Sequence, residues 1–258
     1  MAPFFLRHRR EPAHSVNEMS RATRCIAAGL PYHITQRGVD RRETFSSDDD
    51  RRTYLRLVQR NLPEAEVRLL AWCLMTNHVH LVAVPERDDS LALLLRRVHG
   101  CYSQYYNARH DRSGHLWQNR YFACALGGSH LWSAMAYVER NPVRAGVAQR
   151  AEQYLWSSAA AHVQGRDDSR LLDMDWWHKE HGSEGWAEAL SGDEPERDRE
   201  LIKCTYAGKP FGEEEFVARM ADRFGRHWKR GRPKKVETEI AAARPGRPPA
   251  EQAALFGV

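Results

Sequence analysis

Two histidines separated by one residue are the part of the chain best suited to chemistry. His78 and His80 open an apolar run that ends at Pro85, and its branched side chains are typical of a short buried strand. Because strand side chains alternate between two faces, both imidazoles project to one side, at the spacing that two nitrogen ligands of one divalent metal ion need. The alternative interpretation is a pair of strand histidines whose nitrogens are satisfied by hydrogen bonds.

A helix farther along the chain places a tyrosine and an amide on one polar flank. The pattern predicts an amphipathic helix over residues 129–141, because Ser129 can cap its start and Pro142 disfavours helical geometry at the residue before it. Tyr137 and Asn141 lie away from the apolar stripe on the helical wheel. This flank suits a cleft, with the phenol presented to a metal-bound group and Asn141 close enough to ligate. The stripe itself consists of Leu131, Met135 and Val138.

Four motifs together resemble a known family of DNA-processing enzymes. They occur in the same order and at similar spacing as in the REP-associated tyrosine transposases, a group of the single-tyrosine HUH endonucleases, in which U is a hydrophobic residue. The resemblance runs from about residue 24 to residue 161. The motifs are Tyr32-His-Ile-Thr-Gln-Arg-Gly38, His78-Val-His80, Gly114-His-Leu-Trp-Gln-Asn-Arg120-Tyr-Phe and Tyr137-Val-Glu-Arg-Asn141-Pro-Val-Arg-Ala-Gly146.

The resemblance implies a role for each matching residue. His78 and His80 would bind Mg²⁺ or Mn²⁺, and Tyr137 would be the nucleophile. In related enzymes a polar side chain four residues after the tyrosine can complete the metal site, and here Asn141 stands at that position. The implied reaction cuts and rejoins single-stranded, hairpin-forming repeat DNA through a 5′-phosphotyrosine intermediate. The arginines expected on the DNA-binding surface are Arg37, Arg41, Arg42 and Arg120.

This chemistry requires no nucleotide cofactor. One phosphodiester replaces another, so strands can be rejoined without ATP, and the chain contains no Gly-x-x-x-x-Gly-Lys-Ser/Thr motif. A phenol with a pKa near 10 is mostly protonated at pH 7, so a base must accept its proton. His130, on the same helical flank, and a water molecule on the metal are the two candidates.

The other tyrosines fit structural roles better. Tyr102, Tyr105 and Tyr106 repeat at helical spacing in a predicted helix over residues 90–108, where such aromatic residues usually belong to the core. Tyr32 and Tyr121 lie in predicted strands and have no amide or acid one helical turn away. Tyr137 has its own alternative interpretation, as a buried tyrosine whose hydroxyl is satisfied by His130.

The charge distribution favours a nucleic-acid partner for the central part of the chain. The 258 residues carry a net charge of +5. Residues 24–163 contain 18 arginines, no lysine and 13 acidic residues, whereas residues 164–225 contain 9 basic and 16 acidic residues. Arginine pairs well with phosphate, although genomic base composition can also enrich it. The five cysteines, with no Cys-x-x-Cys pair, fit free thiols in a reducing compartment.

The predicted organisation is one enzymatic domain with extensions. A flexible basic arm (1–23) precedes the transposase domain (24–163), which is followed by an acidic helical extension (164–225) and a basic disordered tail (226–258). Strands are predicted at 32–37, 67–74, 78–84 and 120–125, with helices between them and after the last one. This βαββαβ order with a final helix predicts an α+β, ferredoxin-like sandwich with an antiparallel sheet. Arg230 and Arg232 in the tail resemble an AT-hook that enters the minor groove of DNA.

Two other functions compete with transposition. One is a catalytically silent DNA-binding protein that recognises and regulates palindromic repeats. The other, a histidine-metal phosphohydrolase, leaves Tyr137 without a role and lacks a third alternating histidine, because position 82 is valine. We expect a cytoplasmic, nucleoid-associated protein without a membrane span. The pattern leaves the target sequence and the choice between monomer and homodimer open.

Overall fold

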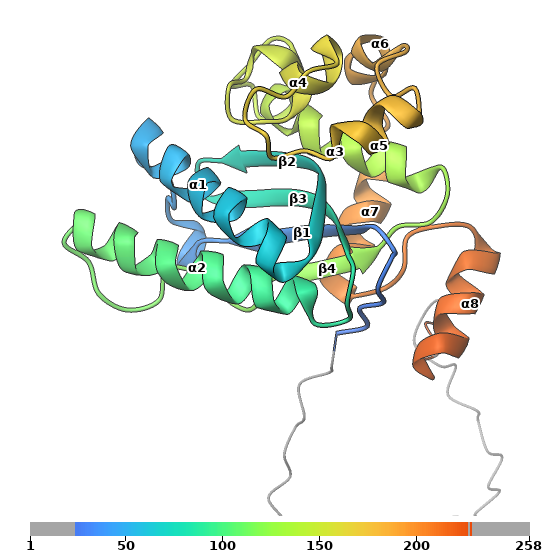
Figure 1. Ribbon diagram of the computed structural model, residues 1–258, viewed down its shortest axis with the longest axis horizontal. Coiled ribbons are helices and arrows are strands. Elements are labelled where there is room, and N and C mark those ends of the chain that lie inside the picture. Colours follow the sequence, from blue (N-terminus) through green and yellow to red (C-terminus); the bar gives the residue numbers. More distant parts are fainter. Residues whose placement is uncertain (1–23, 227, 229–258) are drawn as a thin grey trace, which may run out of the picture. The chain divides into compact units, whose positions relative to one another are not determined.

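A four-stranded antiparallel sheet is the centre of the structure. The computed structural model describes residues 24–226 and 228, and the sheet has the strand order β2-β3-β1-β4 (Figure 1). The predicted arm and the tail arginines Arg230 and Arg232 lie outside the described residues. The strands are β1 (Tyr32–Arg37), β2 (Val67–Met75), β3 (His78–Pro85) and β4 (Phe122–Ala125).

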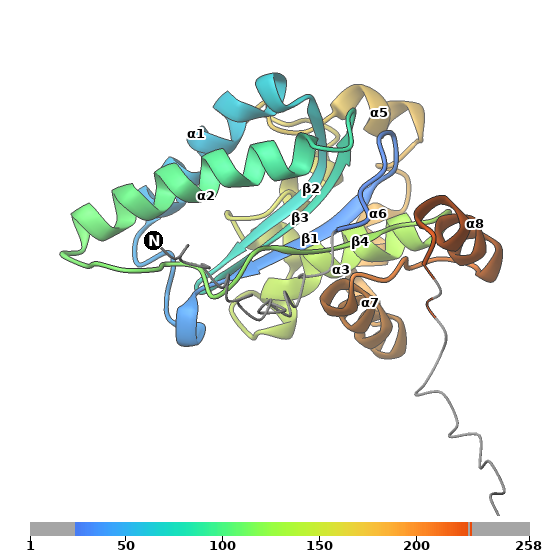
Figure 2. The same ribbon diagram turned by 90° about the horizontal axis from the view of Figure 1, so that it is seen from below.

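Helices cover both faces of this sheet. Helices α1 and α2 pack against each other on one face, whereas α3 lies across the other face beside α7 (Pro195–Ala207) (Figure 2). The order β1-α1-β2-β3-α2-β4-α3 and the antiparallel pairing confirm the predicted ferredoxin-like α+β sandwich. The helices and 3-10 turns of this part are η1 (Val39–Arg41), α1 (Asp48–Ala65), α2 (Ser90–Arg109) and α3 (His130–Arg144).

The helical extension packs on the outer side of α3. Trp177 and Trp186 are almost fully buried, and their rings meet Trp132 of α3 at centroid distances of 5.7 and 5.9 Å. These aromatic contacts join the extension to the same hydrophobic core as the sheet. Two short elements follow α3, η2 (Ala151–Gln153) and α4 (Ala159–Gln164). The elements of the extension are α5 (Met174–Lys179), α6 (Trp186–Ser191), α7 (Pro195–Ala207) and α8 (Glu214–Phe224).

Helix α3 continues past the proline that was expected to end it. It runs to Arg144 with Pro142 inside, so the predicted end near Asn141 is wrong. Proline has no N–H for the carbonyl of Val138, one turn back. The side-chain amide of Asn141 donates to that carbonyl at 3.4 Å and to the carbonyl of Tyr137 at 2.8 Å, which compensates for the missing donor.

No helix among the described residues combines the length and the apolar character that crossing a bilayer requires.

Candidate active site

The sheet face beneath α3 gathers three histidines. In the antiparallel register of β1 and β3, Thr35 is opposite His80, Arg37 is opposite His78, and His33 is opposite Val82. Directly opposed residues project to the same face. His33, Arg37, His78 and His80 therefore share one face of the sheet, although β1 and β3 are distant in sequence.

Helix α3 brings Tyr137 to these histidines. The centroid of its ring lies 5.5 Å from that of His80 and 5.8 Å from that of His33, in both cases edge-on. The rings of His78 and His80 are 4.9 Å apart. The structure thus brings a phenol from one element and two imidazoles from another into a single cluster.

The phenol is strongly shielded from solvent. Tyr137 is only 5% exposed, and burial raises the pKa of its phenol to about 12. The guanidinium of Arg144, 5.0 Å from the ring centroid, acts in the opposite direction and lowers this pKa. The phenol is protonated at neutral pH, and the narrow exposed area leaves little room for the approach of a DNA strand.

The paired imidazoles are neutral and oriented. Burial lowers the pKa of His78 to about 4 and that of His80 well below its usual range, and the nearby Arg37 adds to both shifts. The side-chain nitrogen of Asn77 donates to the carbonyl of Arg41, so its oxygen faces Nδ1 of His78 at 2.7 Å. Nδ1 of His80 lies 2.9 Å from Nε2 of His33. In both rings Nε2 is therefore the nitrogen left for a metal ion.

This donor set fits a divalent ion that keeps part of its coordination for substrate and water. Within residues 24–226 and 228, no group of three or more His, Cys, Asp or Glu side chains could hold a metal. Two neutral imidazoles suit ions such as Mn²⁺, and phosphate oxygens and water commonly fill the remaining positions. The amide of Asn141 is turned to the backbone of its own helix, and its role as a ligand stays a prediction.

His130 does not lie beside the phenol. Its ring packs edge-on against Phe211, with centroids 4.6 Å apart, and Nδ1 is 3.7 Å from the carboxylate of Glu213. It stands two helical turns before Tyr137, a rise of about 10 Å. The candidate role of His130 as base, and the alternative in which it satisfies a buried Tyr137, both lack the required contact.

The predicted DNA-binding arginines surround the end of the sheet that carries His78. Arg41, Arg42 and Arg120 are exposed, whereas Arg37 is half-buried. The Nε of Arg37 is a buried donor with no hydrogen-bond partner among the described residues. A guanidinium beside this pair of histidines is a group that could bind a phosphate oxygen.

Sequence reasoning missed the residue that anchors α3 to the extension. Glu139 is fully buried, and its carboxylate faces the Ser158 hydroxyl, Nδ1 of His162 at 2.6 Å and Nε1–H of Trp186 at 2.8 Å. The only signal was its place inside the motif that begins at Tyr137. A carboxylate with three hydrogen-bond partners thus ties the helix of the tyrosine to α4 and α6.

A second anchor lies next to it. Arg140 donates to the carbonyl of Gly192 at 2.7 Å and to Asp198 of α7 at 3.3 Å. Asp198 is 2% exposed and also accepts from Arg144 at 2.9 Å. This buried ion pair ties α3 to α7, and so places Arg144 over the ring of Tyr137.

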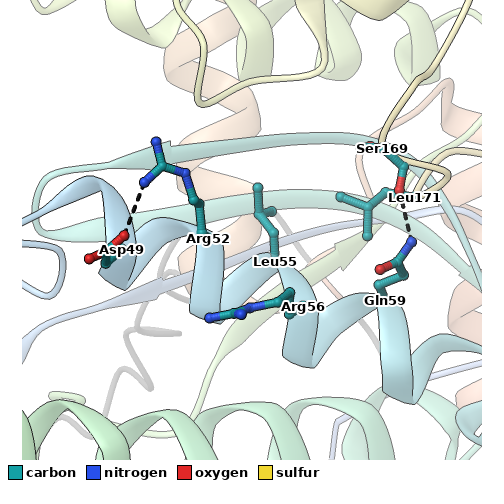
Figure 3. Close-up of a pocket in the computed structure, with 7 residues that line it drawn as sticks. All are labelled: Asp49, Arg52, Leu55, Arg56, Gln59, Ser169 and Leu171. Atoms are coloured by element: carbon teal, nitrogen blue, oxygen red, sulfur yellow. Dashed lines mark hydrogen bonds and ion pairs between the residues drawn. The ribbon is translucent and has the colours of Figure 1, made fainter.

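A surface pocket lies elsewhere on the molecule. It is on α1, which covers the sheet face opposite the histidines, and Figure 3 shows Arg52 turned to Asp49 and Gln59 turned to the carbonyl of Ser169. It holds no histidine or cysteine. The lining residues are Asp49, Arg52, Leu55, Arg56, Gln59, Ser169 and Leu171.

Comparisons with known proteins agree with the motifs. The chain is similar to a solved structure described as "Structure of the REP associates tyrosine transposase bound to a REP hairpin", with 19% identity and a TM-score of 0.48 over 61% of this chain and 91% of that chain. None of the curated proteins matches it. The model of the family described as "Transposase IS200 like" matches residues 27–141. The matched segment contains both histidines and Tyr137, and the match confirms the resemblance seen in the motifs.

Proposed function

We propose that the protein is a tyrosine transposase that cuts and rejoins single-stranded, hairpin-forming DNA. The observation that carries the proposal is the 5.5 Å separation of the Tyr137 and His80 rings, which belong to different elements of the fold. The match of residues 27–141 to the model of IS200-like transposases supports the same reaction. The solved REP-associated transposase that resembles this chain is bound to a REP hairpin, and we infer a hairpin substrate of the same kind here.

In the proposed reaction, the Tyr137 oxygen attacks a phosphorus atom of the strand. One P–O bond forms to the phenol and the bond to the 3′ oxygen breaks, which leaves a 5′-phosphotyrosine and a free 3′ hydroxyl. The phenol loses a proton and the departing 3′ oxygen gains one, so the step is balanced. Attack by another 3′ hydroxyl on the phosphotyrosine reverses these changes and rejoins DNA without ATP.

The surrounding residues orient and stabilise the reacting groups. A divalent ion held by His78 and His80, with Asn141 as the proposed third ligand, would stabilise the charge that develops on the phosphate oxygens. The guanidinium of Arg37, which lies opposite His78 in the sheet, would contact the same phosphate. Arg144 lowers the pKa of Tyr137 and so opposes the effect of burial, which favours loss of the phenol proton.

One observation favours a second candidate function. With Tyr137 only 5% exposed, the structure describes a state in which the nucleophile is largely covered. A protein that remained in this state would bind hairpins without cutting them. This is the catalytically silent regulator of palindromic repeats.

The two functions are separated by trapping the covalent intermediate. The protein is incubated with Mn²⁺ and labelled single-stranded hairpins of varied loop and flank, and products are resolved under denaturing conditions. A transposase forms a labelled protein–DNA adduct that Tyr137→Phe abolishes while hairpin binding is retained. Tyr105→Phe on α2 is the matched control and should form the adduct normally. Binding without any adduct would favour the regulator, and an undiminished adduct in Tyr137→Phe would exclude this nucleophile.

A further inference from the structure

A chain of buried hydrogen bonds connects the extension to His80. The Thr205 hydroxyl of α7 lies 2.8 Å from the carbonyl of Leu201 and 2.7 Å from Nδ1 of His33. Nε2 of His33 lies 2.9 Å from Nδ1 of His80. His33 and Thr205 are completely buried and His80 is 3% exposed, so water does not compete for these contacts.

The direction of every proton in this chain follows from its first acceptor. The Thr205 hydroxyl donates its single proton to the carbonyl of Leu201, which can only accept. The Thr205 oxygen must then accept from Nδ1–H of His33. The thiol of Cys124, 3.2 Å away, is consistent with this direction, because it can donate to the same oxygen.

The order continues through the two imidazoles. His33 contacts no carboxylate among the described residues, and a charged ring without a partner is very costly in a buried site, so the ring is neutral. A neutral imidazole with its proton on Nδ1 accepts at Nε2. Nδ1–H of His80 therefore donates to His33, and Nε2 of His80 carries a free lone pair.

We propose that His33 and Thr205 are positioning residues that set the tautomer of His80 and so present its Nε2 to the metal ion. This inference rests on the proposed function for the identity of the metal site, but the tautomer itself does not depend on that function. The proposal gives α7 a part in the active site, because the hydroxyl that orients the hydrogen bonds of His33 and His80 belongs to this helix. Hydrogen-bond partners of metal-binding histidines typically change metal affinity by 10–100-fold when they are removed.

The first test reads the tautomer directly, without metal or DNA. Nitrogen NMR of the full-length protein with ¹⁵N-labelled histidine should show His80 protonated at Nδ1 and unprotonated at Nε2. His33 should show the same pattern. A His80 ring protonated at Nε2 would overturn the proposal, whether or not the protein is a transposase.

The second test removes the Thr205 hydroxyl, from which the series of hydrogen bonds begins. Thr205→Val keeps the side-chain volume but removes the acceptor for His33, so the proton of His33 can move to Nε2 and that of His80 to the nitrogen that faces the metal. We expect the His80 nitrogen signals to shift and the affinity for Mn²⁺, measured by electron paramagnetic resonance, to fall about tenfold. Thr205→Ser keeps the hydroxyl and should match the wild type in both measurements.

The outcomes distinguish this proposal from the proposed function. A folded Thr205→Val variant with the wild-type tautomer and Mn²⁺ affinity would refute the positioning role. Equal losses in Thr205→Ser and Thr205→Val would also refute it, because packing rather than the hydroxyl would then be responsible. A wild-type protein that binds Mn²⁺ and shows the expected tautomer, but forms no DNA adduct, would support the positioning role and contradict transposition.

Discussion

Glu139 provides the most quantitative test of how the site is supported. Glu139→Ala removes a buried carboxylate that has three hydrogen-bond partners, and leaves Ser158, His162 and Trp186 without it. A hydrogen bond to a charged group contributes roughly 1.5–3 kcal/mol, and such contributions within one network are not additive. Breaking a buried charged contact costs roughly 3–5 kcal/mol. We therefore expect the free energy of unfolding to fall by about 4 kcal/mol.

The loss is measured by urea unfolding followed by tryptophan fluorescence, because Trp186 donates to the carboxylate and Trp177 stacks on its partner His162. Glu139→Gln keeps the side-chain shape and one acceptor oxygen, so its free energy of unfolding should fall by about half as much. This variant can still be measured if Glu139→Ala does not fold. Glu64→Ala is the control, because Glu64 pairs with Arg97 on the exposed surface and should cost under about 1 kcal/mol. Equal effects of Glu64→Ala and Glu139→Ala would refute the reasoning.

Three further changes have defined outcomes. His80→Ala should abolish the DNA adduct and Mn²⁺ binding but retain hairpin binding; tight Mn²⁺ binding by this variant would place the metal elsewhere. Burial lowers the pKa of His99 to about 3 in the folded protein. As the pH falls below about 6.5, His99 therefore takes up a proton in the unfolded chain but not in the folded one. Between pH 7 and pH 5 the free energy of unfolding of the wild type should fall by about 2 kcal/mol more than that of His99→Gln. Arg37→Gln should weaken hairpin binding and reduce the slope of log affinity against log salt by about 1; an unchanged slope would remove Arg37 from the phosphate contacts.

The secondary structure could be predicted because its signals are local. The first strand was predicted at residues 32–37 and occurs there, and the histidine strand extends one residue past its predicted end. Alternation within β3 alone puts His78 and His80 on one face. The predicted end of α3 is wrong because the side-chain amide of Asn141 replaces the backbone donor that Pro142 lacks. This compensation depends on a side-chain rotamer, which the sequence pattern does not specify.

The supporting contacts could not be predicted, since they join residues that are distant in the chain. His33 and Thr205 are separated by 172 positions, and nothing local marks either as a partner of the other. The burial of Glu139 is equally hidden: a charged residue in an amphipathic helix normally faces water. Only the packing of Trp186 against α3 reveals that this helix has a second buried side.

The contacts that support the candidate site therefore extend beyond the end of the family match. The match ends at residue 141, and three residues beyond it contact the site. Trp186 and Asp198 bond to Glu139 and Arg140 of α3. Thr205 bonds to His33. Removing α7 would expose the buried guanidinium of Arg140 and leave His33 without its acceptor. A buried cation that loses its partner is destabilising, so a chain truncated at residue 163 should unfold more readily than the full protein and lose the fixed tautomer of His80. The acidic extension therefore contributes structural contacts to the site, although the sequence predicts it only as a segment that follows the domain of the site.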